Sequence, residues 1–426
     1  MNSNNNDQKT LCNMLECDID CTQDFYAYNI PIVKFDYNHF NLKCFISVLN
    51  IALIFLFNSC MTREQDDRNQ PTDPISDSVV HTPITYNFYI ENSGSMKGYF
   101  ANNDYNIKTI ITEYYDRISE KNTTELDTIT LNYINATIEK SNLDIKTFVN
   151  TTRNHCTAAY TKIDDILAIA MDSLKDNQVN IIISDFCFSS DYSNIAIAQS
   201  GITRLFTTRL NKDKDMAIAI FKYDCDFNGK YYPGGLSCSH RLPIYIWAFG
   251  SNLQIKEIAR LPIKELHEEM IIQQHQYLIP EFEVKNGRML DKNDNSIIVS
   301  KWSTERNSND YILKFKVDMS SISLGETYLV DINKYVVNGD YLINRIEKDP
   351  NTEIYTYSII TNHPSPGVVK ISLINSIPSW VDKSNFDGDG VPNEGQTLGI
   401  KPLIEGVYDA YNNKNSKYLT ININIK

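Results

Sequence analysis

The apolar and polar positions of this chain follow two different spacings. From Pro83 to about Leu261, short apolar runs alternate with segments in which apolar residues recur at every third or fourth position. The predicted strands cover residues 86–91, 128–134, 179–185, 216–221 and 243–250, and the predicted helices cover residues 106–118, 163–174 and 195–210. This alternation predicts an α/β fold with a doubly wound, mostly parallel sheet, whose ligands bind at the carboxyl ends of the strands.

The spacing changes to simple alternation from about residue 280. Short runs at residues 313–318, 354–359, 368–373 and 419–426 alternate apolar with polar residues, and turns rich in Asn, Gly, Pro and Ser separate them. This pattern is typical of a smaller antiparallel β-sandwich, here with one amphipathic helix near residues 401–411. The chain without its leader is too long for one ordinary domain. We therefore predict a first domain over residues 83–262 and a β-rich second domain over residues 263–426.

The start of the chain carries an export signal. Residues 43–57 form an apolar run that is too short and too interrupted for a membrane span but fits the core of a signal peptide. The run ends in Asn58-Ser59-Cys60, which resembles the lipobox of bacterial lipoproteins, although Phe57 stands where the strict motif has Leu. This looser form resembles lipoproteins of the Bacteroidetes group and implies that a lipid on Cys60 holds the protein to the membrane. The alternative is a signal anchor that is never cleaved.

The residues on either side of this signal complete the predicted leader. Residues 1–59 form the leader, and its polar, Asn-rich part at 1–41 fits an over-extended gene model better than the start of a signal peptide. Residues 60–82 are polar, acidic and contain proline, which predicts a flexible tether. Acidic residues soon after the lipidated cysteine also resemble the surface-export signal of Bacteroidetes lipoproteins. We expect a lipid anchor in the outer membrane, facing either the cell surface or the periplasm.

An oxygen-rich turn follows the first predicted strand. Glu91, Ser93 and Ser95 stand at alternate positions directly after this strand. Thr161 opens a helical pattern further along the chain, and Asp185 ends another apolar strand. Because the carboxyl ends of parallel strands lie at one edge of a sheet, these oxygen atoms can meet around a hard divalent cation.

This set of residues resembles the metal-ion-dependent adhesion site of von Willebrand factor A domains, whose first element reads Asp-x-Ser-x-Ser. Glu91 stands where that family has Asp, and Ser184-Asp185-Phe186 stands where it has Thr-Asp-Gly. The resemblance implies Mg²⁺, or else Mn²⁺ or Ca²⁺, held by five side chains: Glu91, Ser93, Ser95, Thr161 and Asp185. An open coordination position would then take a carboxylate from a protein partner, without enzymatic turnover.

Each element of the predicted site also has a simpler interpretation. Serines such as Ser93 and Ser95 are common turn residues, Thr161 with Asp164 fits a helix-capping box, and Asp185 fits an ordinary strand end. Two other functions stay open for the same residues. One is a metal-dependent hydrolase of the phosphoesterase kind, since strand-end carboxylates with Mg²⁺ also serve hydrolysis. The other is a degenerate A domain that binds protein without metal.

A second oxygen-rich segment lies near the C-terminus. Asn385, Asp387, Asp389 and Asn393 surround two glycines, in a pattern that resembles the calcium loops of EF-hands and thrombospondin type 3 repeats. The segment has Asn385 where those loops begin with Asp, and it lacks the bidentate Glu at the twelfth position. An acidic, glycine-rich hairpin turn is the favoured interpretation, and a Ca²⁺ site is the alternative.

Four cysteines follow the lipidation point, and an even number fits an exported protein with disulfides. Cys225 and Cys238 flank a turn rich in Gly, Tyr and Pro that a disulfide could staple. Cys156 and Cys187 lie close in sequence to the predicted metal loops, so they could also be neighbours. The alternative is four buried free thiols.

Charge and missing motifs limit the remaining functions. The formal net charge of −13 leaves no basic stripe to neutralise phosphates, which argues against nucleic acid as a partner. The chain contains no His-Glu-x-x-His, Gly-x-Ser-x-Gly, Walker loop or dinucleotide fingerprint. We therefore expect a binding protein rather than an enzyme.

Overall fold

The structure of the chain is a computed structural model. It describes residues 82–101, 107–121, 127–158, 162–188, 195–232, 235–265, 267–282, 290–291, 296–298, 303–304, 310–412 and 416–426. The predicted leader, Cys60 and all but the last residue of the predicted tether lie outside these ranges, and so does Thr161. Within them, no helix is both long enough and apolar enough to cross a membrane.

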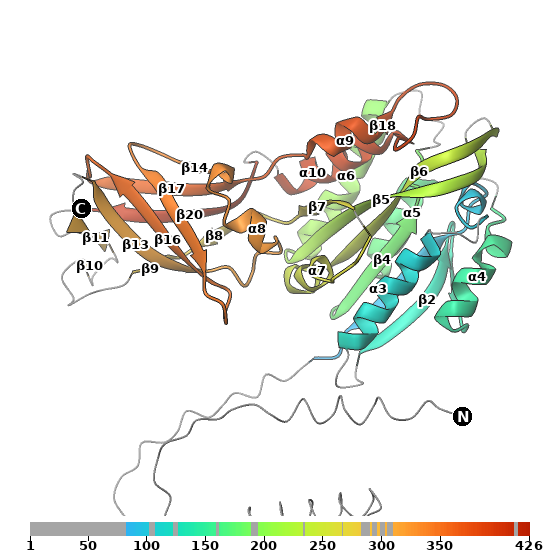
Figure 1. Cartoon of the computed structure of the whole chain (residues 1–426), viewed down its shortest axis with the longest axis horizontal. Helices are drawn as coiled ribbons and strands as arrows, with labels where there is room; N and C mark the ends of the chain where they lie inside the picture. The colour runs from blue at the N-terminus through green and yellow to red at the C-terminus, as the bar shows by residue number, and fades with distance from the viewer. Residues whose placement is uncertain are drawn as a thin grey trace, which may run out of the picture. The chain divides into compact units, whose positions relative to one another are not determined.

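A seven-stranded sheet organises the first half of the described chain (Figure 1). Its strands are β1 (Thr85–Glu91), β2 (Thr128–Ile134), β3 (Ile138–Ser141), β4 (Gln178–Ser184), β5 (Met216–Tyr231), β6 (Leu236–Ser251) and β7 (Glu268–Ile272). They lie in the order β3-β2-β1-β4-β6-β5-β7. The apolar runs at residues 86–90 and 179–183 are β-branched and aromatic, and their residues are buried in the middle of the sheet.

Helices cover both faces of this sheet. One face packs on α3 (Ile107–Lys121), α4 (Ile145–His155) and α7 (Asn252–Ala259), and the other on α5 (Ile163–Ser173), α6 (Ile195–Lys212) and α10 (Ile400–Asn412). Successive strand residues separate accordingly, since Phe88 and Ile90 belong to one core and Tyr89 to the other. The helical and strand spacings of the sequence thus produce a layered α/β unit.

The sheet is mixed, so the expectation of a mostly parallel sheet was wrong. Only the pairs β1–β2 and β1–β4 are parallel. The pairs β4–β6, β5–β6 and β5–β7 are antiparallel. The cause is the segment between residues 222 and 242. Its residues extend the two predicted short strands into a hairpin of two 16-residue strands, which only residues 232–235 separate. A turn this short joins antiparallel strands and leaves no room for a crossover helix.

Two further sheets form the β-rich part of the chain. One joins β8 (Gln276–Leu278), β10 (Leu290–Asp291), β11 (Ser296–Ile297), β14 (Tyr335–Val337), β17 (Gly367–Ile374) and β20 (Lys417–Ile425). The other joins β9 (Glu281–Phe282), β12 (Ser303–Thr304), β13 (Tyr311–Asp318), β15 (Leu342–Lys348) and β16 (Ile354–Thr361). Their apolar residues pack in one cluster. β20 shows the expected alternation, with Ile421 and Ile423 buried and Asn422 and Asn424 exposed.

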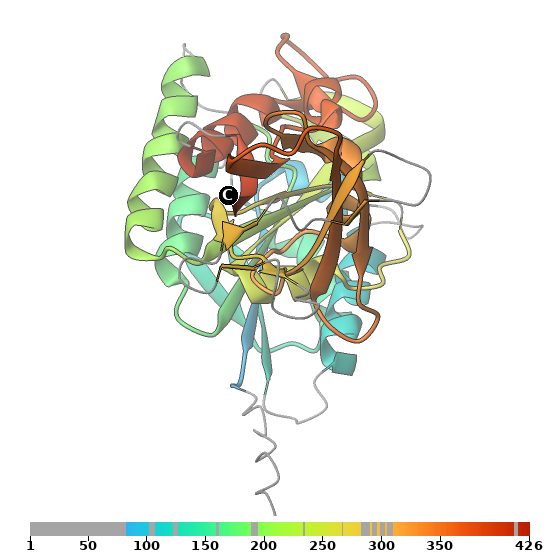
Figure 2. The ribbon, with the colours of Figure 1, turned by 90° about the vertical axis from the view of Figure 1, so that its left-hand side faces the viewer.

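Short elements complete the second half: α8 (Glu326–Leu329), η4 (Ile332–Lys334), α9 (Ser379–Ser384), β18 (Asn385–Phe386) and β19 (Thr397–Leu398). The helix expected near residues 401–411 is present as α10, but it packs on α6 and not on the sandwich (Figure 2). Gly406 allows this approach, because a Cβ there would lie 2.8 Å from the Gln199 carbonyl.

The second half therefore contributes to the first core. β7, α9 and α10 all follow residue 262, yet β7 extends the first sheet, and residues of α9 and α10 such as Trp380 and Ile404 belong to a core of that sheet. Polar contacts join the halves as well, since buried Lys256 on α7 forms an ion pair with Glu353 at 2.7 Å. The division at residues 262/263 stays a prediction about independent folding.

Candidate metal centre

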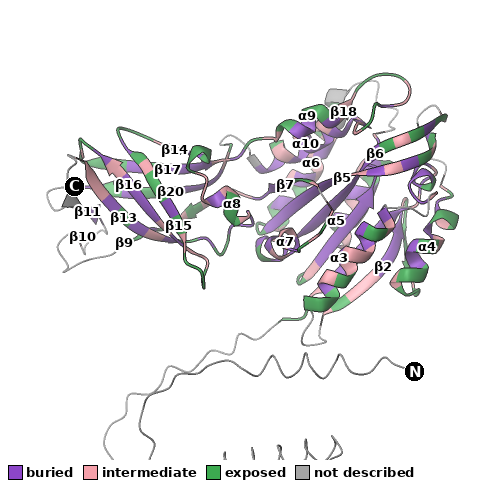
Figure 3. Cartoon of the chain, viewed as in Figure 1, coloured by how far each residue is buried: buried purple, intermediate pink, exposed green. Residues whose placement is uncertain are grey.

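The ends of β1 and β4 form the centre of the predicted site. The two strands are parallel neighbours, and their register pairs Ile90 with Ile183. Their next residues, Glu91 and Ser184, therefore end the two strands side by side, and Asp185 follows directly after β4. The surrounding strands are buried along most of their length (Figure 3). Glu91 and Asp185 are only 2% and 3% exposed, so two carboxyl groups are enclosed at one edge of the sheet.

The turn after β1 brings the two serine hydroxyls to the same edge. Ser93 and Ser95 are both buried, and their Oγ atoms lie 2.9 Å apart in a hydrogen bond. Ala158 holds this turn, because its carbonyl accepts from Gly94 N at 2.9 Å and its own N–H donates to the Asn92 carbonyl at 3.3 Å. The turn thus has a fixed conformation that presents hydroxyls rather than charges.

Thr161 is the one predicted ligand that lies outside the described residues. Ala158 lies three residues before Thr161 along the chain, and it pairs with Ser93 in an isolated β-bridge. The helix that follows has Lys162 at its N-cap, with no side-chain hydrogen bond there, and Asp164 and Asp165 in its first turn. That helix start lies one residue later than the capping-box interpretation of Thr161 requires.

The environment of Asp185 disfavours its charged form. Burial is the larger cause and the negative charge of Glu91 the smaller one, and together they raise the pKa of Asp185 to about 7. Hydrogen bonding from Cys187 N and from the Ser95 hydroxyl acts in the opposite direction and lowers this pKa. Asp185 Oδ1 accepts from Cys187 N at 3.0 Å. Its Oδ2 is buried and forms no hydrogen bond of normal geometry in the described part of the chain, although the Ser95 hydroxyl lies near enough to stabilise the charged form. Such an orphaned carboxylate oxygen is the kind of group that a cation or proton satisfies.

Ser184 is a site residue whose role we did not foresee. Its hydroxyl donates to Glu91 Oε2 and accepts from Phe186 N at 2.8 Å. The sequence indicated Ser184 only as the residue at the position where the Thr-Asp-Gly element has Thr. The available signal was a hydroxyl residue directly before a strand-end Asp, but only the β1–β4 register shows that it faces Glu91.

Phe186 has a left-handed backbone conformation, which glycine adopts more easily than other residues. Its φ of +46° lies in the left-handed region, which costs a residue with a side chain roughly 1 kcal/mol. The ring is fully buried and stacks on Trp247 with 4.5 Å between centroids, and this packing offsets the strain. The left-handed backbone directly after Asp185 is thus formed by a residue with a side chain.

The long hairpin and a C-terminal segment cover the loop after β4. Cys187 Sγ lies 3.2 Å from Tyr231 OH in a hydrogen bond, and Tyr231 OH accepts from Leu398 N at 3.1 Å. Phe188 N in turn donates to the Leu398 carbonyl at 2.9 Å. No sequence pattern indicated this contact, because it joins residues more than 160 positions apart.

The structure contains no disulfide among the four predicted cysteines, which are all buried free thiols. In the β5–β6 hairpin, Cys225 pairs with Leu242 and Cys238 pairs with Gly229. This register separates the two cysteines by four positions, roughly 13 Å along the strands, beyond the reach of a disulfide. Cys156 and Cys187 instead donate to carbonyls, Cys156 to Thr152 at 3.3 Å and Cys187 to Tyr232 at 2.9 Å. The disulfide predictions were therefore wrong.

The two asparagines of the segment at residues 385–394 make hydrogen bonds within the surrounding structure. Asn385 Oδ1 accepts from Lys401 N at 3.1 Å, where it caps the start of α10. Asn393 Nδ2 donates to Gln396 Oε1 at 3.1 Å, while Asp387 and Asp389 are exposed. These contacts fit an acidic turn, but the strands on either side of it, β18 and β19, pair in parallel, so the expected hairpin was wrong.

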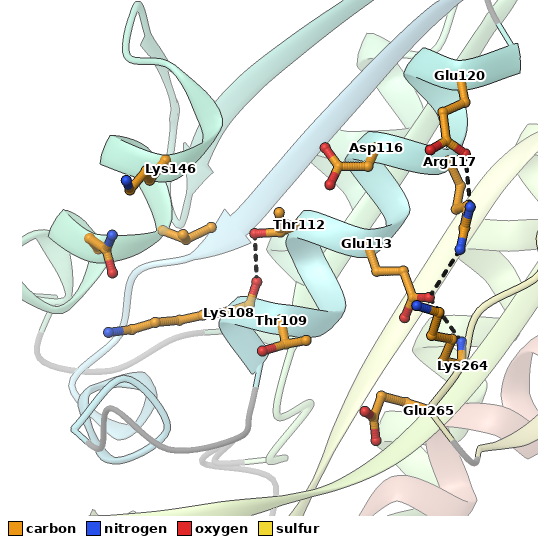
Figure 4. A pocket seen from close by; sticks show the side chains of 12 residues that line it. Lys108, Thr109, Thr112, Glu113, Asp116, Arg117, Glu120, Lys146, Lys264 and Glu265 are labelled. Atoms are coloured by element: carbon orange, nitrogen blue, oxygen red, sulfur yellow. Dashed lines mark hydrogen bonds and ion pairs between the residues drawn. The ribbon is translucent and has the colours of Figure 1, made fainter. Parts of the chain in front are cut away.

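A large hollow lies elsewhere, between α3 and α4 (Figure 4). Its volume is about 610 Å³, and basic and acidic side chains line it together. Arg117 is already paired there, with Glu120 at 2.8 Å and Glu113 at 3.8 Å. None of the predicted metal ligands lines this hollow.

The donor set at the strand ends fits a hard divalent cation. All its donors are oxygens, from two carboxylates and two hydroxyls, and such ligands suit Mg²⁺, Mn²⁺ and Ca²⁺. Within the described ranges, no lysine or arginine pairs with Glu91 or Asp185. No group of three His, Cys, Asp or Glu residues gathers anywhere in the part of the chain that the structure covers. The strand-end set has only two such residues and would depend on hydroxyls for the rest.

A scan against protein-family models finds no match for this chain, and a search of curated proteins finds no significantly similar sequence. The geometry of the chain's own residues therefore carries the functional argument.

Proposed function

We propose that this chain is an exported, lipid-anchored protein that binds a protein partner through a divalent cation at the ends of β1 and β4. Glu91 and Asp185 would supply the charged oxygens, and Ser93 and Ser95 would supply neutral ones. Thr161 is the fifth ligand that the resemblance to von Willebrand factor A domains implies. With two carboxylates the formal charges of ligands and ion would balance, and because the other three ligands are neutral hydroxyls, the ion would stay electron-poor enough to bind a carboxylate of the partner at an open position.

One observation carries the proposal, namely two enclosed carboxyl groups with an orphaned oxygen between neighbouring strand ends. Burying a carboxylate without a counter-charge is costly, and two together repel each other. In the described chain, Asp185 Oδ2 forms no hydrogen bond of normal geometry and neither carboxyl group has a basic partner. A divalent cation would supply the missing charge and the missing contact at once.

The approach to this site lies beside the tip of the β5–β6 hairpin. A Cβ placed on Gly94 would lie 3.8 Å from the ring of Tyr232, which is 37% exposed. The proposed ligands themselves are almost fully buried, so a partner would have to offer a projecting side chain. A single Asp or Glu carboxylate fits that requirement better than a flat surface.

Titration calorimetry on the full chain tests the metal site. We expect one Mg²⁺ or Mn²⁺ site in the wild type, and no binding after Asp185→Ala or after Ser93→Ala combined with Ser95→Ala. Acetate at millimolar concentration serves as a probe for the open position. It should tighten Mg²⁺ binding by the same factor by which Mg²⁺ tightens acetate binding, whereas neutral acetamide should not. A wild type that binds no divalent ion at millimolar concentration would leave a metal-free binding domain.

The same material distinguishes binding from hydrolysis. A metal-dependent phosphoesterase should release phenolate from a phosphoester such as p-nitrophenyl phosphate in the presence of Mn²⁺. We expect no metal-dependent release above the rate of the Asp185→Ala variant. Turnover that this substitution abolishes would favour the hydrolase instead.

The anchor is tested separately, since Cys60 lies outside the described residues. The variant Cys60→Ser should leave the membrane fraction and stop incorporating labelled fatty acid. Membrane attachment that survives this substitution would identify residues 43–57 as an uncleaved anchor.

A further inference from the structure

The body of the β5–β6 hairpin packs directly on the turn that carries the two serines. Gly229 of the hairpin faces Gly98, the last residue of the short helix η1 (Ser95–Gly98), and a Cβ placed on Gly229 would lie 2.8 Å from the Gly98 Cα. The Phe227 ring covers Gly98 so closely that a Cβ there would overlap it. Two glycines thus let the two backbones approach each other, and a side chain at either position would push the hairpin away from the turn.

The end of the same hairpin is held by the loop after β4. Cys187 Sγ donates to the Tyr232 carbonyl at 2.9 Å and lies 3.2 Å from the Tyr231 hydroxyl in a second hydrogen bond. Tyr231 is itself buried. The hairpin therefore bridges the two loops that carry the proposed ligands, and its tip has a fixed place beside both.

The ring of Tyr232 lies at this tip between two glycines. A Cβ placed on Gly94 would lie 3.8 Å from the ring carbon Cε2, and one placed on Gly235 would lie 3.7 Å from Cε1. Neither glycine has a side chain that could cover the ring, and Tyr232 is 37% exposed. Because Gly94 separates Ser93 from Ser95, an exposed aromatic ring lies next to the two hydroxyls proposed as ligands.

We infer that Tyr232 is a specificity-determining residue, which makes the proposed site prefer a carboxylate that carries an apolar group. The inference rests on the proposed function, because an ion must first hold the carboxylate. The atoms attached to that carboxylate would then come within reach of the ring, and contact between apolar atoms and an aromatic ring favours binding. The partner would present an acidic residue beside an apolar one rather than within a run of charged residues.

Two small carboxylates test this preference in the full chain with saturating Mg²⁺. Calorimetry should show that 3-phenylpropionate binds about tenfold more tightly than acetate, roughly the effect of burying one or two methylene groups. Tyr232→Ser should make the two dissociation constants nearly equal, whereas Tyr232→Phe keeps the ring and should keep the preference. The matched control is Tyr277→Ser, which removes an exposed tyrosine of β8 in the β-rich part of the chain and should leave the ratio unchanged.

A metal-free measurement tests the position of the hairpin. Gly229→Ala places a Cβ against Gly98 and should lift the hairpin from the turn, so iodoacetamide should alkylate Cys187 several-fold faster than in the wild type. Mass spectrometry locates the modified thiols in the presence of a chelator, and Cys156 is the internal reference, since unfolding would expose both cysteines. Gly201→Ala is the control, because a Cβ there meets nothing within 4 Å. Unchanged protection of Cys187 in Gly229→Ala would overturn the inference.

The other outcomes separate the inference from the proposed function. If both carboxylates bind with Mg²⁺ but the wild type does not prefer 3-phenylpropionate, or Tyr232→Ser keeps the preference, the inference fails and the proposed function stands. Loss of the preference in Tyr232→Phe would assign it to the hydroxyl, and binding of 3-phenylpropionate that persists with a chelator would place it away from the ion; either result overturns the inference. If the wild type binds no Mg²⁺, or binds Mg²⁺ but neither carboxylate, both fail.

Discussion

The turn after β1 and the turn after β18 both carry oxygen side chains at alternate positions, but they satisfy those oxygens differently. Glu91 and Asp185 are enclosed at the first, and one carboxylate oxygen forms no hydrogen bond of normal geometry in the described chain. At the second, Asn385 caps α10 while Asp387 and Asp389 face solvent. Water satisfies an exposed carboxylate at no cost, whereas an enclosed one needs a partner. The comparison teaches that burial, more than acidic spacing, distinguishes a candidate metal site from a polar turn.

The largest expected effect is a loss of stability of the metal-free protein as the pH rises. The pKa of Asp185 is about 7 in the folded chain, against an ordinary value of 3.8. Between about pH 4 and pH 7 the folded state keeps a proton that the unfolded state loses, so the free energy of unfolding falls as the pH rises through this range. Chemical denaturation at pH 4.5, 6 and 8 with a chelator measures this fall.

Asp185→Asn is the control for that pH dependence. The amide keeps an acceptor for Cys187 N but has no charge to bury, so the variant should be more stable than the wild type at pH 8 and about equal at pH 4.5. Saturating Mg²⁺ should reduce the fall in the wild type and have no effect on the variant. Equal pH profiles for wild type and variant would show that Asp185 is not the titrating group.

The next effect separates the two turns by metal affinity. Asp185→Ala removes an enclosed ligand and should weaken Mg²⁺ binding at least about 100-fold, or about 2.7 kcal/mol, so that calorimetry no longer detects it. Phe186 and Cys187 anchor the backbone there, so the loss should arise from the missing oxygen. Calorimetry on the full chain measures the dissociation constant, and circular dichroism confirms that the variant is folded. A variant that keeps wild-type affinity would move the ion away from β4.

The sequence predicted the parts of this fold that local spacing determines. The strands at residues 86–90 and 179–183 are recognisable as continuous apolar runs that are buried throughout. The strand at 419–425 and the helix at 400–412 are recognisable because their apolar residues recur with a period near 2.0 or 3.6 residues. The direction of β5 and β6 was missed because residues 222–242 are polar at their exposed positions and contain turn residues, although they extend both strands. Pairing direction depends on the connection, which apolar spacing does not report.

The candidate site divides in the same way. The order Glu91, Ser93, Ser95 and Asp185 could be predicted from motif spacing, and the β1–β4 register brings them to one edge. The hydroxyl of Ser184 and the contact between Tyr231 and Leu398 could not, because both depend on strand neighbours that are distant in sequence. The disulfide between Cys225 and Cys238 failed because the two cysteines lie at unequal distances from the turn, so the hairpin register does not place them opposite each other.

A smaller effect should follow when the second turn loses its structural contact. Asn385→Ala removes the acceptor for Lys401 N at the start of α10. Gly399, the residue before this helix, has a φ of +70° and no side chain that could accept this hydrogen bond instead. Loss of a helix cap costs about 1 kcal/mol. Denaturant unfolding should show this decrease with and without Ca²⁺, and Asn385→Asp, which keeps an acceptor oxygen, should recover most of it. A decrease that appears only with Ca²⁺ present would indicate a calcium loop instead.

The smallest effect is expected where the second turn is most acidic. Asp387 and Asp389 are exposed, so replacing both with Asn removes two solvated charges and little else. Exposed substitutions of this kind change the free energy of unfolding by about 0.5 kcal/mol or less. The double variant should therefore keep wild-type stability and wild-type Mg²⁺ affinity, and the response of its Tm to millimolar Ca²⁺ should be the same as in the wild type. If Ca²⁺ raises the Tm of the wild type but not of this variant, the turn binds calcium, and burial would no longer distinguish the two oxygen-rich turns.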